Sequence, residues 1–150
     1  AVLSIFGSIF GITYGPIQCR FSEALCVLPF FLPETAWGLG VGCLIANLLS
    51  PYGVLDIVVG SAATLLAALL TARCQKKWLA PLPPVIANTV LIGLVLAYEQ
   101  AGTSAAFWPT YAFNALTVGL GEAVACYGLG GLLLWRLDKS NALQHYLQNR

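Results

Sequence analysis

Charged side chains are too scarce in this chain to cover a surface that faces water. Asp, Glu, Lys and Arg make up only 9% of its 150 residues, whereas hydrophobic residues make up 59%. Water-soluble domains carry about 25% charged residues. The chain must therefore place most of its outer surface in a lipid bilayer, and the composition predicts an integral membrane protein.

Proline, glycine and charged residues divide the chain into six apolar stretches. They cover residues 1–14, 21–33, 36–50, 54–73, 81–99 and 109–135. A helix needs about 20 apolar residues to cross the hydrocarbon, so we expect the stretch at 21–33 to be tilted or partly interfacial. The first stretch is short too and has no methionine before it, so we expect the natural chain to begin earlier. The prediction is one domain, residues 1–150, folded as an all-α integral membrane protein with a six-transmembrane-helix bundle and a truncated first helix.

The cations are distributed unevenly between the two sides of such a bundle. Six of the seven follow the fourth or the sixth stretch and fall on one side: Arg73, Lys76, Lys77, Arg136, Lys139 and Arg150. Only Arg20 falls on the other side. Cytoplasmic loops carry an excess of Lys and Arg, so we expect both termini to be cytoplasmic and the loop around Arg20 to face outward.

No pattern in the chain predicts a metal, a cofactor or a catalytic residue. The five cysteines are scattered, without a C-x-x-C pair or metal-ligand spacing, and we interpret them as small buried hydrophobic residues. The single histidine, His145, lies in the polar tail. A net charge of +1 gives no indication of binding to nucleic acid.

Polar residues within the apolar stretches are the candidates for a site, because each is costly in hydrocarbon and needs a partner or a role. Tyr111, Asn114 and Glu122 share one face of the sixth helix. Asn88 and Glu99 share a face of the fifth helix. Glu122 lies about 20 Å from the outer end of its helix at 1.5 Å per residue, so we expect it beyond mid-membrane.

The order of these polar residues predicts a blind pocket that opens to the outside. Asn47 and Asp56 flank the outer turn between the third and fourth helices, and Trp108 adds an aromatic face at the outer end of the sixth. The cytoplasmic halves of the helices are nearly apolar. Carboxylates and amides suit a flat heterocycle with donor and acceptor edges, or an amine.

Each candidate also has a purely structural interpretation. An isolated asparagine such as Asn88 can join helices without touching a ligand, and Asp56 can cap the fourth helix. Glu99 can be an interfacial residue. Glu122 is the strongest candidate for a functional site, because it is a mid-depth carboxylate with no cation near it in the sequence.

Four segments together resemble one family. They are YGPIQCRFSEALCVLPFF, GCLIANLLSPYGVLDIVVGSAATLLAALL, LAPLPPVIAN and GLGEAVACYGLG, in this order and over nearly the whole chain. They are similar to the QueT family, substrate-binding S components of energy-coupling factor (ECF) transporters for queuosine precursors. The resemblance implies a six-helix S component in the bacterial cell membrane. It would capture a 7-deazaguanine such as 7-aminomethyl-7-deazaguanine from outside.

The resemblance also implies partners and site residues. Uptake would need a membrane coupling subunit and two ABC-type ATPases, since this chain has no G-x-x-x-x-G-K-[ST] phosphate loop. Carried onto this sequence, the substrate-proximal loop and the pocket are Gln18, Arg20, Glu23, Asn47, Asp56, Asn88, Asn114 and Glu122. S components commonly dock through an alanine pair on the first helix, where this chain shows only Ala1 and a stripe at Gly7 and Gly11. That stripe can equally serve packing within the chain.

Arg20 and Glu23 are three residues apart, a spacing that lets them pair if the second helix has begun there. We expect this pair at the outer mouth, where it fixes the loop over the pocket while Gln18 presents its amide to the solute. The alternative is a structural clasp without ligand contact.

Three other functions stay open from the sequence. One is an S component for another vitamin or a purine-like solute. Another is an integral-membrane enzyme that uses Glu122 or Asp56 as an acid or base. The third is an assembly subunit whose small-residue stripes only bind partners.

Overall fold

The computed structural model describes residues 21–48 and 53–140, and within them every regular element is a helix. The 3₁₀-helix η1 (Phe21–Phe30) is followed by α2 (Thr35–Asn47). The next helix is continuous and consists of α3 (Gly53–Leu55), the π-helix η2 (Asp56–Gly60) and α4 (Ser61–Ala72). The short 3₁₀-helix η3 (Lys77–Leu79) leads into α5 (Leu82–Ala101). The last helix is formed by α6 (Phe107–Ala123), the π-helix η4 (Val124–Gly130) and α7 (Gly131–Asp138).

The all-helical class is therefore confirmed for the described part of the chain. Each apolar stretch from 21–33 onward corresponds to a helix, and the stretch at 1–14 lies outside the described residues. The stretch at 21–33 contains only the ten-residue η1, about 20 Å long at 2.0 Å per residue. That length is shorter than the ~30 Å hydrocarbon core. The count of six membrane crossings stays a prediction.

Within residues 21–48 and 53–140, two helices are long and apolar enough to cross a membrane. They are Lys77–Ala101, with 25 residues and a mean hydropathy of 1.9, and Phe107–Asp138, with 32 residues and a mean hydropathy of 1.4. Large apolar side chains on their outer faces are exposed, including Leu116 and Leu120 on α6. An outer surface of this kind suits lipid rather than water.

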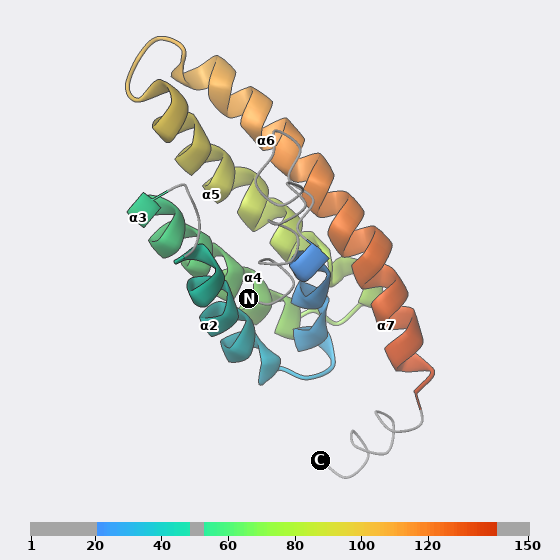
Figure 1. Cartoon of the computed structure of the whole chain (residues 1–150). Coiled ribbons are helices and arrows are strands. Elements are labelled where there is room, and N and C mark those ends of the chain that lie inside the picture. Colours follow the sequence, from blue (N-terminus) through green and yellow to red (C-terminus); the bar gives the residue numbers. More distant parts are fainter. Residues whose placement is uncertain (1–20, 49–52, 141–150) are drawn as a thin grey trace.

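The helices α5 and α6 form a long antiparallel pair, with α4 packed against α5, α2 packed against α4, and η1 near the end that carries α7 (Figure 1). Gly102, with a φ of +56°, ends α5 and starts the turn into α6. The pair approaches closely because small residues face each other. A Cβ atom added at Gly93 would lie 3.2 Å from the Cα atom of Ala115.

Two apolar clusters form the core of the bundle. The first joins Ala63 of α4, Ile92 and Leu96 of α5, and Val118 of α6. The second joins Val27, Ala80 and Leu134, where η1 meets the start of α5 and the end of the last helix. The polar residues described below lie among and beside these clusters.

A salt bridge brings the two groups of cations to one end of the molecule. The Lys77 Nζ atom lies 2.6 Å from the Asp138 Oδ1 atom, so the loop after α4 meets the end of α7. The described part of this geometry agrees with the predicted clustering of cations on one side. The orientation of that side toward the cytoplasm stays a prediction.

Candidate functional site

Six of the predicted site residues are buried in the described bundle: Glu23, Asn47, Asp56, Asn88, Asn114 and Glu122. Burial of polar groups in an apolar bundle is costly unless each group is hydrogen-bonded. The contacts of these residues therefore show which of them can act together.

Asn88 and Glu122 form a close polar contact between α5 and α6. The Asn88 Nδ2 atom donates to the Glu122 Oε1 atom at 2.8 Å, and the exposed fractions of the two residues are only 2% and 5%. The short distance follows from helix packing, since Gly119 sits opposite Thr89 one turn away from this pair. The sequence predicted both residues as candidates, and the structure places them together.

Glu122 also has a sulfur neighbour that the sequence interpretation missed. The Cys126 Sγ atom lies 3.6 Å from the Glu122 Oε2 atom and 3.4 Å from the backbone oxygen of Glu23, and these two acceptors share its single S–H donor. The Cys26 thiol donates to the Glu23 Oε2 atom at 3.1 Å. These contacts join Glu23, Cys26, Asn88, Glu122 and Cys126 into one buried group, here called the deep polar cluster.

Both thiols contact carboxyl groups, so interpreting the cysteines only as buried hydrophobic residues was incomplete. Cys126 follows Glu122 by four residues and Cys26 follows Glu23 by three, which are the spacings that bring side chains together on a helix. That spacing was the available signal in the sequence. A thiol is a weak donor, so these contacts are easily exchanged for stronger ones.

The sequence prediction puts Glu23 at the outer mouth, whereas the structure puts it beside Cys126, away from the loop between α5 and α6. Cys126 lies one turn beyond Glu122, on the side away from the loop between α5 and α6, and its contact places Glu23 at the same depth. The reason is the packing of η1, which lies against η4 and α4. Glu23 therefore faces the deep end of the bundle.

A second polar contact joins α2 to η2. The Asn47 Nδ2 atom donates to the backbone oxygen of Asp56 at 3.1 Å. Nearby, the Thr64 hydroxyl donates to the Cys43 sulfur at 3.2 Å. The close approach of α2 to η2 requires a glycine at position 60, because a Cβ atom there would lie 2.6 Å from the Asn47 Nδ2 atom.

This contact and the deep polar cluster adjoin the same part of α5. The Ile92 side chain lies 3.6 Å from the position of a Cβ atom at Gly60, and Asn88 precedes Ile92 by one helical turn. Both π-helical segments hold residues of these contacts: Asp56 in η2 and Cys126 in η4. Short π-helical segments within α-helices are frequently found at functional sites.

The remaining described candidates lie toward the loop between α5 and α6. The Asn114 Nδ2 atom donates to the Gln100 Oε1 atom at 3.2 Å, which joins the last turn of α5 to α6. The rings of Trp108 and Tyr111 meet edge to face, with centroids 6.2 Å apart, and Trp108 is largely exposed. Trp108 precedes Glu122 by fourteen residues, about 21 Å along α6, so the aromatic pair does not contact the deep polar cluster.

Several predicted residues lie outside the described part of the chain. They are Gln18 and Arg20, in the predicted substrate loop, and Ala1, Gly7 and Gly11, in the predicted docking stripe. The predicted pairing of Arg20 with Glu23 stays a prediction for the same reason.

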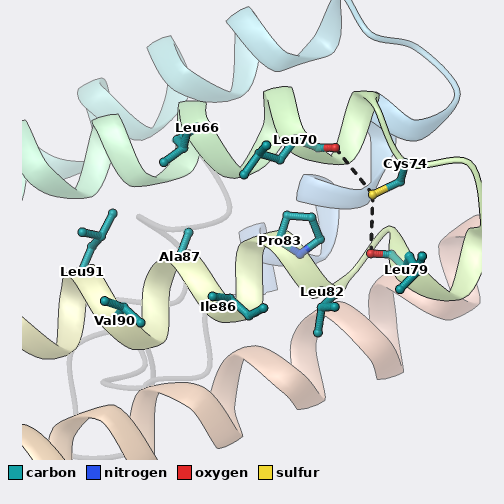
Figure 2. Close-up of a pocket in the computed structure, with 10 residues that line it drawn as sticks. All are labelled: Leu66, Leu70, Cys74, Leu79, Leu82, Pro83, Ile86, Ala87, Val90 and Leu91. Atoms are coloured by element: carbon teal, nitrogen blue, oxygen red, sulfur yellow. Dashed lines mark hydrogen bonds between the residues drawn. The ribbon is translucent and has the colours of Figure 1, made fainter.

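The hollows on the described part of the bundle include two apolar ones that no predicted site residue lines. One of about 590 Å³ lies between α4 and α5 (Figure 2), and one of about 280 Å³ lies between α2 and α4. Their linings are almost entirely hydrophobic. They differ in this from the deep polar cluster, which offers carboxyl, amide and thiol groups.

The sequence model of the QueT transporter family matches residues 1–139. The chain belongs to the QueT transporter family. A relative in Lactococcus lactis subsp. cremoris (strain MG1363), named "Queuosine precursor transporter QueT", is 37% identical over 81 residues. This alignment covers 51% of the chain and 47% of the relative, so it spans about half the length of each protein. No solved structure matches the chain.

Family membership decides between the broad functional classes. The family and its curated relative are both named as transporters, so the chain belongs to a family of transporters rather than to a family of enzymes. The resemblance drawn from the four sequence segments is confirmed. The alternative in which Glu122 or Asp56 acts as a catalytic acid or base is set aside.

Proposed function

We propose that this chain is the S component of an ECF importer and that it captures a queuosine precursor from outside the cell. The ligand would be 7-aminomethyl-7-deazaguanine or a related 7-deazaguanine. The name of the relative from Lactococcus lactis supports this substrate class. The observation that carries the proposal is the buried contact between Asn88 and Glu122 in the deep polar cluster.

The chemistry of these two side chains complements a guanine-like edge. The edge of a 7-deazaguanine presents N–H donors beside a carbonyl oxygen, and a carboxylate accepts such donors while an amide N–H donates to the carbonyl. Paired hydrogen bonds to an ionised carboxylate are among the stronger hydrogen bonds in proteins. In our proposal Glu122 accepts from the N–H groups of the ligand, and Asn88 donates to its carbonyl.

Glu23 is suited to the aminomethyl group. Its carboxyl group belongs to the same cluster and accepts from the Cys26 thiol, a weak donor that an ammonium group can replace. The two glutamates would then hold opposite ends of the ligand, while Cys126, which contacts both residues, fixes their spacing. Asn47 and Asp56 would line the route toward the cluster.

The remaining parts of the proposal concern assembly and topology. The chain would cross the membrane six times with both termini in the cytoplasm. Delivery of the ligand would require a membrane coupling subunit and two ABC-type ATPases. Gln18 and Arg20 are proposed for the substrate loop, and Ala1, Gly7 and Gly11 for the docking surface.

A thermal-shift titration of the detergent-purified chain tests the substrate class. The ligands are 7-aminomethyl-7-deazaguanine, its 7-cyano analogue, queuine and guanine. A ligand at 100 times its Kd stabilises the folded state by about 2.7 kcal/mol, which corresponds to a Tm increase of about 5–10 °C. We expect this increase with the aminomethyl compound and a smaller one with guanine.

The other outcomes separate the alternatives. An equal shift with guanine would favour an S component for a general purine-like solute. No shift with any of the four compounds would contradict the proposed substrate. Uptake by proteoliposomes that contain the chain, the coupling subunit and both ATPases, and its loss when the ATPases are omitted, tests the ECF assignment separately.

A further inference from the structure

An apolar groove runs along the outer surface between α4 and α5. Leu66 and Leu70 of α4 form one wall, and Leu82, Ile86 and Val90 of α5 form the other (Figure 2). Its volume is about 590 Å³. The lining side chains of α5 extend from Leu82 to Leu91, about 14 Å at 1.5 Å per residue.

The walls of the groove are exposed although they are hydrophobic. Ile86 is 53% exposed and Leu70 is 42% exposed. Ile86 belongs to the helix Lys77–Ala101, which is long and apolar enough to cross a membrane. In a bilayer this surface meets acyl chains. A groove of this length on such a surface accommodates an extended hydrocarbon chain.

One end of the groove carries positive charge. Cys74 and Leu79 close this end, with the Cys74 thiol donating to the backbone oxygens of Leu70 at 3.5 Å and Leu79 at 3.7 Å (Figure 2). Arg73 and Lys76 belong to the same loop and are exposed.

The same loop also carries Trp78, which is 65% exposed. Exposed tryptophans are enriched at the level of the lipid headgroups, so the loop lies where the headgroups lie. Lys77 is held by Asp138. Arg73 and Lys76 are therefore the cations that this loop presents beside the groove.

We propose that the groove is a binding site for an anionic phospholipid of the surrounding bilayer. One acyl chain lies between α4 and α5, and the phosphate-bearing headgroup lies against Arg73 and Lys76. Basic residues at the headgroup end of an interhelical groove bind anionic lipids in preference to neutral ones. The segment 141–150 is a poor occupant, since it carries Arg150 and no acidic side chain and does not complement the two cations.

Lipid retention by the whole chain tests this site. The purified protein is equilibrated with equal amounts of dioleoyl-phosphatidylglycerol and dioleoyl-phosphatidylcholine, and the bound lipid is counted by native mass spectrometry. Each cation near the surface contributes about fivefold to binding of an anionic lipid, the equivalent of ~1 kcal/mol. We expect phosphatidylglycerol to be preferred, and the variant R73Q/K76Q to lose this preference by about 20-fold or more.

Matched variants separate the groove from general effects. Arg136→Gln removes an exposed cation of α7 and should leave the preference intact. Leu70→Trp fills the groove and should reduce retention of both lipids, whereas Leu116→Trp, on the outer face of α6, should not. Equal retention of the two lipids by the unaltered chain would overturn the proposal. So would a preference that R73Q/K76Q and Arg136→Gln weaken equally.

Discussion

Glu122 and Asn88 stabilise each other inside a bundle that is otherwise apolar. Both residues could be predicted as buried candidates from the sequence, because a carboxylate and an amide within apolar stretches are rare and need partners. The contacts of Cys126 and Cys26 with the two glutamates were missed, because a thiol is compatible with both apolar and polar surroundings and the helical spacing alone does not decide between them. The depth of Glu23 was missed because it depends on how η1 packs.

A double-mutant cycle on Asn88 and Glu122 tests their contact. Asn88→Ala and Glu122→Gln should each lower the free energy of unfolding, and the double variant should lose less than the sum. The expected coupling is about 0.5–1.5 kcal/mol, as for other hydrogen bonds between membrane helices. The control pair is Asn88→Ala with Glu99→Gln, because Glu99 is exposed near the far end of α5. Equal coupling in both pairs would mean that the 2.8 Å contact contributes nothing specific.

The helices themselves were largely predictable at the scale of elements. Apolar stretches at 81–99 and 109–135 correspond to α5 and to the helix that starts with α6, with boundaries shifted by a few residues. The π-helical segments η2 and η4 were not predicted, because their backbone geometry depends on tertiary contacts that hydrophobic periodicity does not record. In η2 the relevant contact is the approach of Asn47 to Gly60.

Gly60→Ala tests the packing of α2 against η2. The new methyl group would lie 2.6 Å from the Asn47 Nδ2 atom and 3.4 Å from the Asp56 Oδ1 atom, so Asn47 would have to move. Overpacking of this kind costs about 1–3 kcal/mol, and we expect the Tm to fall by about 2–10 °C. Circular dichroism melting measures the change.

Gly38→Ala is the matched control for that substitution. Gly38 lies within α2, and a Cβ atom there would meet nothing within 4 Å. Alanine is favoured over glycine in a helix by up to ~1 kcal/mol, so the Tm should stay constant or rise. A similar decrease in Tm for both variants would contradict the packing described for Gly60.

At the scale of the whole molecule, the structure combines an apolar exterior with a small buried polar region. The apolar exterior follows from the composition, because a chain with only 9% charged residues cannot cover its surface with charged side chains. The deep polar cluster draws on η1, α5, α6 and η4, so it exists only when the bundle is assembled. For this reason the sequence could predict single residues of the cluster, whereas the fold was needed to show which of them lie together. A transporter of this family can use such a region to hold a polar solute within the membrane.

The measurement that tests this account most directly is a calorimetric titration of 7-aminomethyl-7-deazaguanine into three forms of the chain: unaltered, Glu122→Gln and Glu99→Gln. A hydrogen bond to a charged group contributes about 1.5–3 kcal/mol, so Glu122→Gln should weaken binding by about 10- to 150-fold. Glu99→Gln should leave the Kd within about twofold, since any interaction of this exposed carboxylate is weak. Retained affinity in Glu122→Gln would contradict the assignment of Asn88 and Glu122 as the ligand anchor.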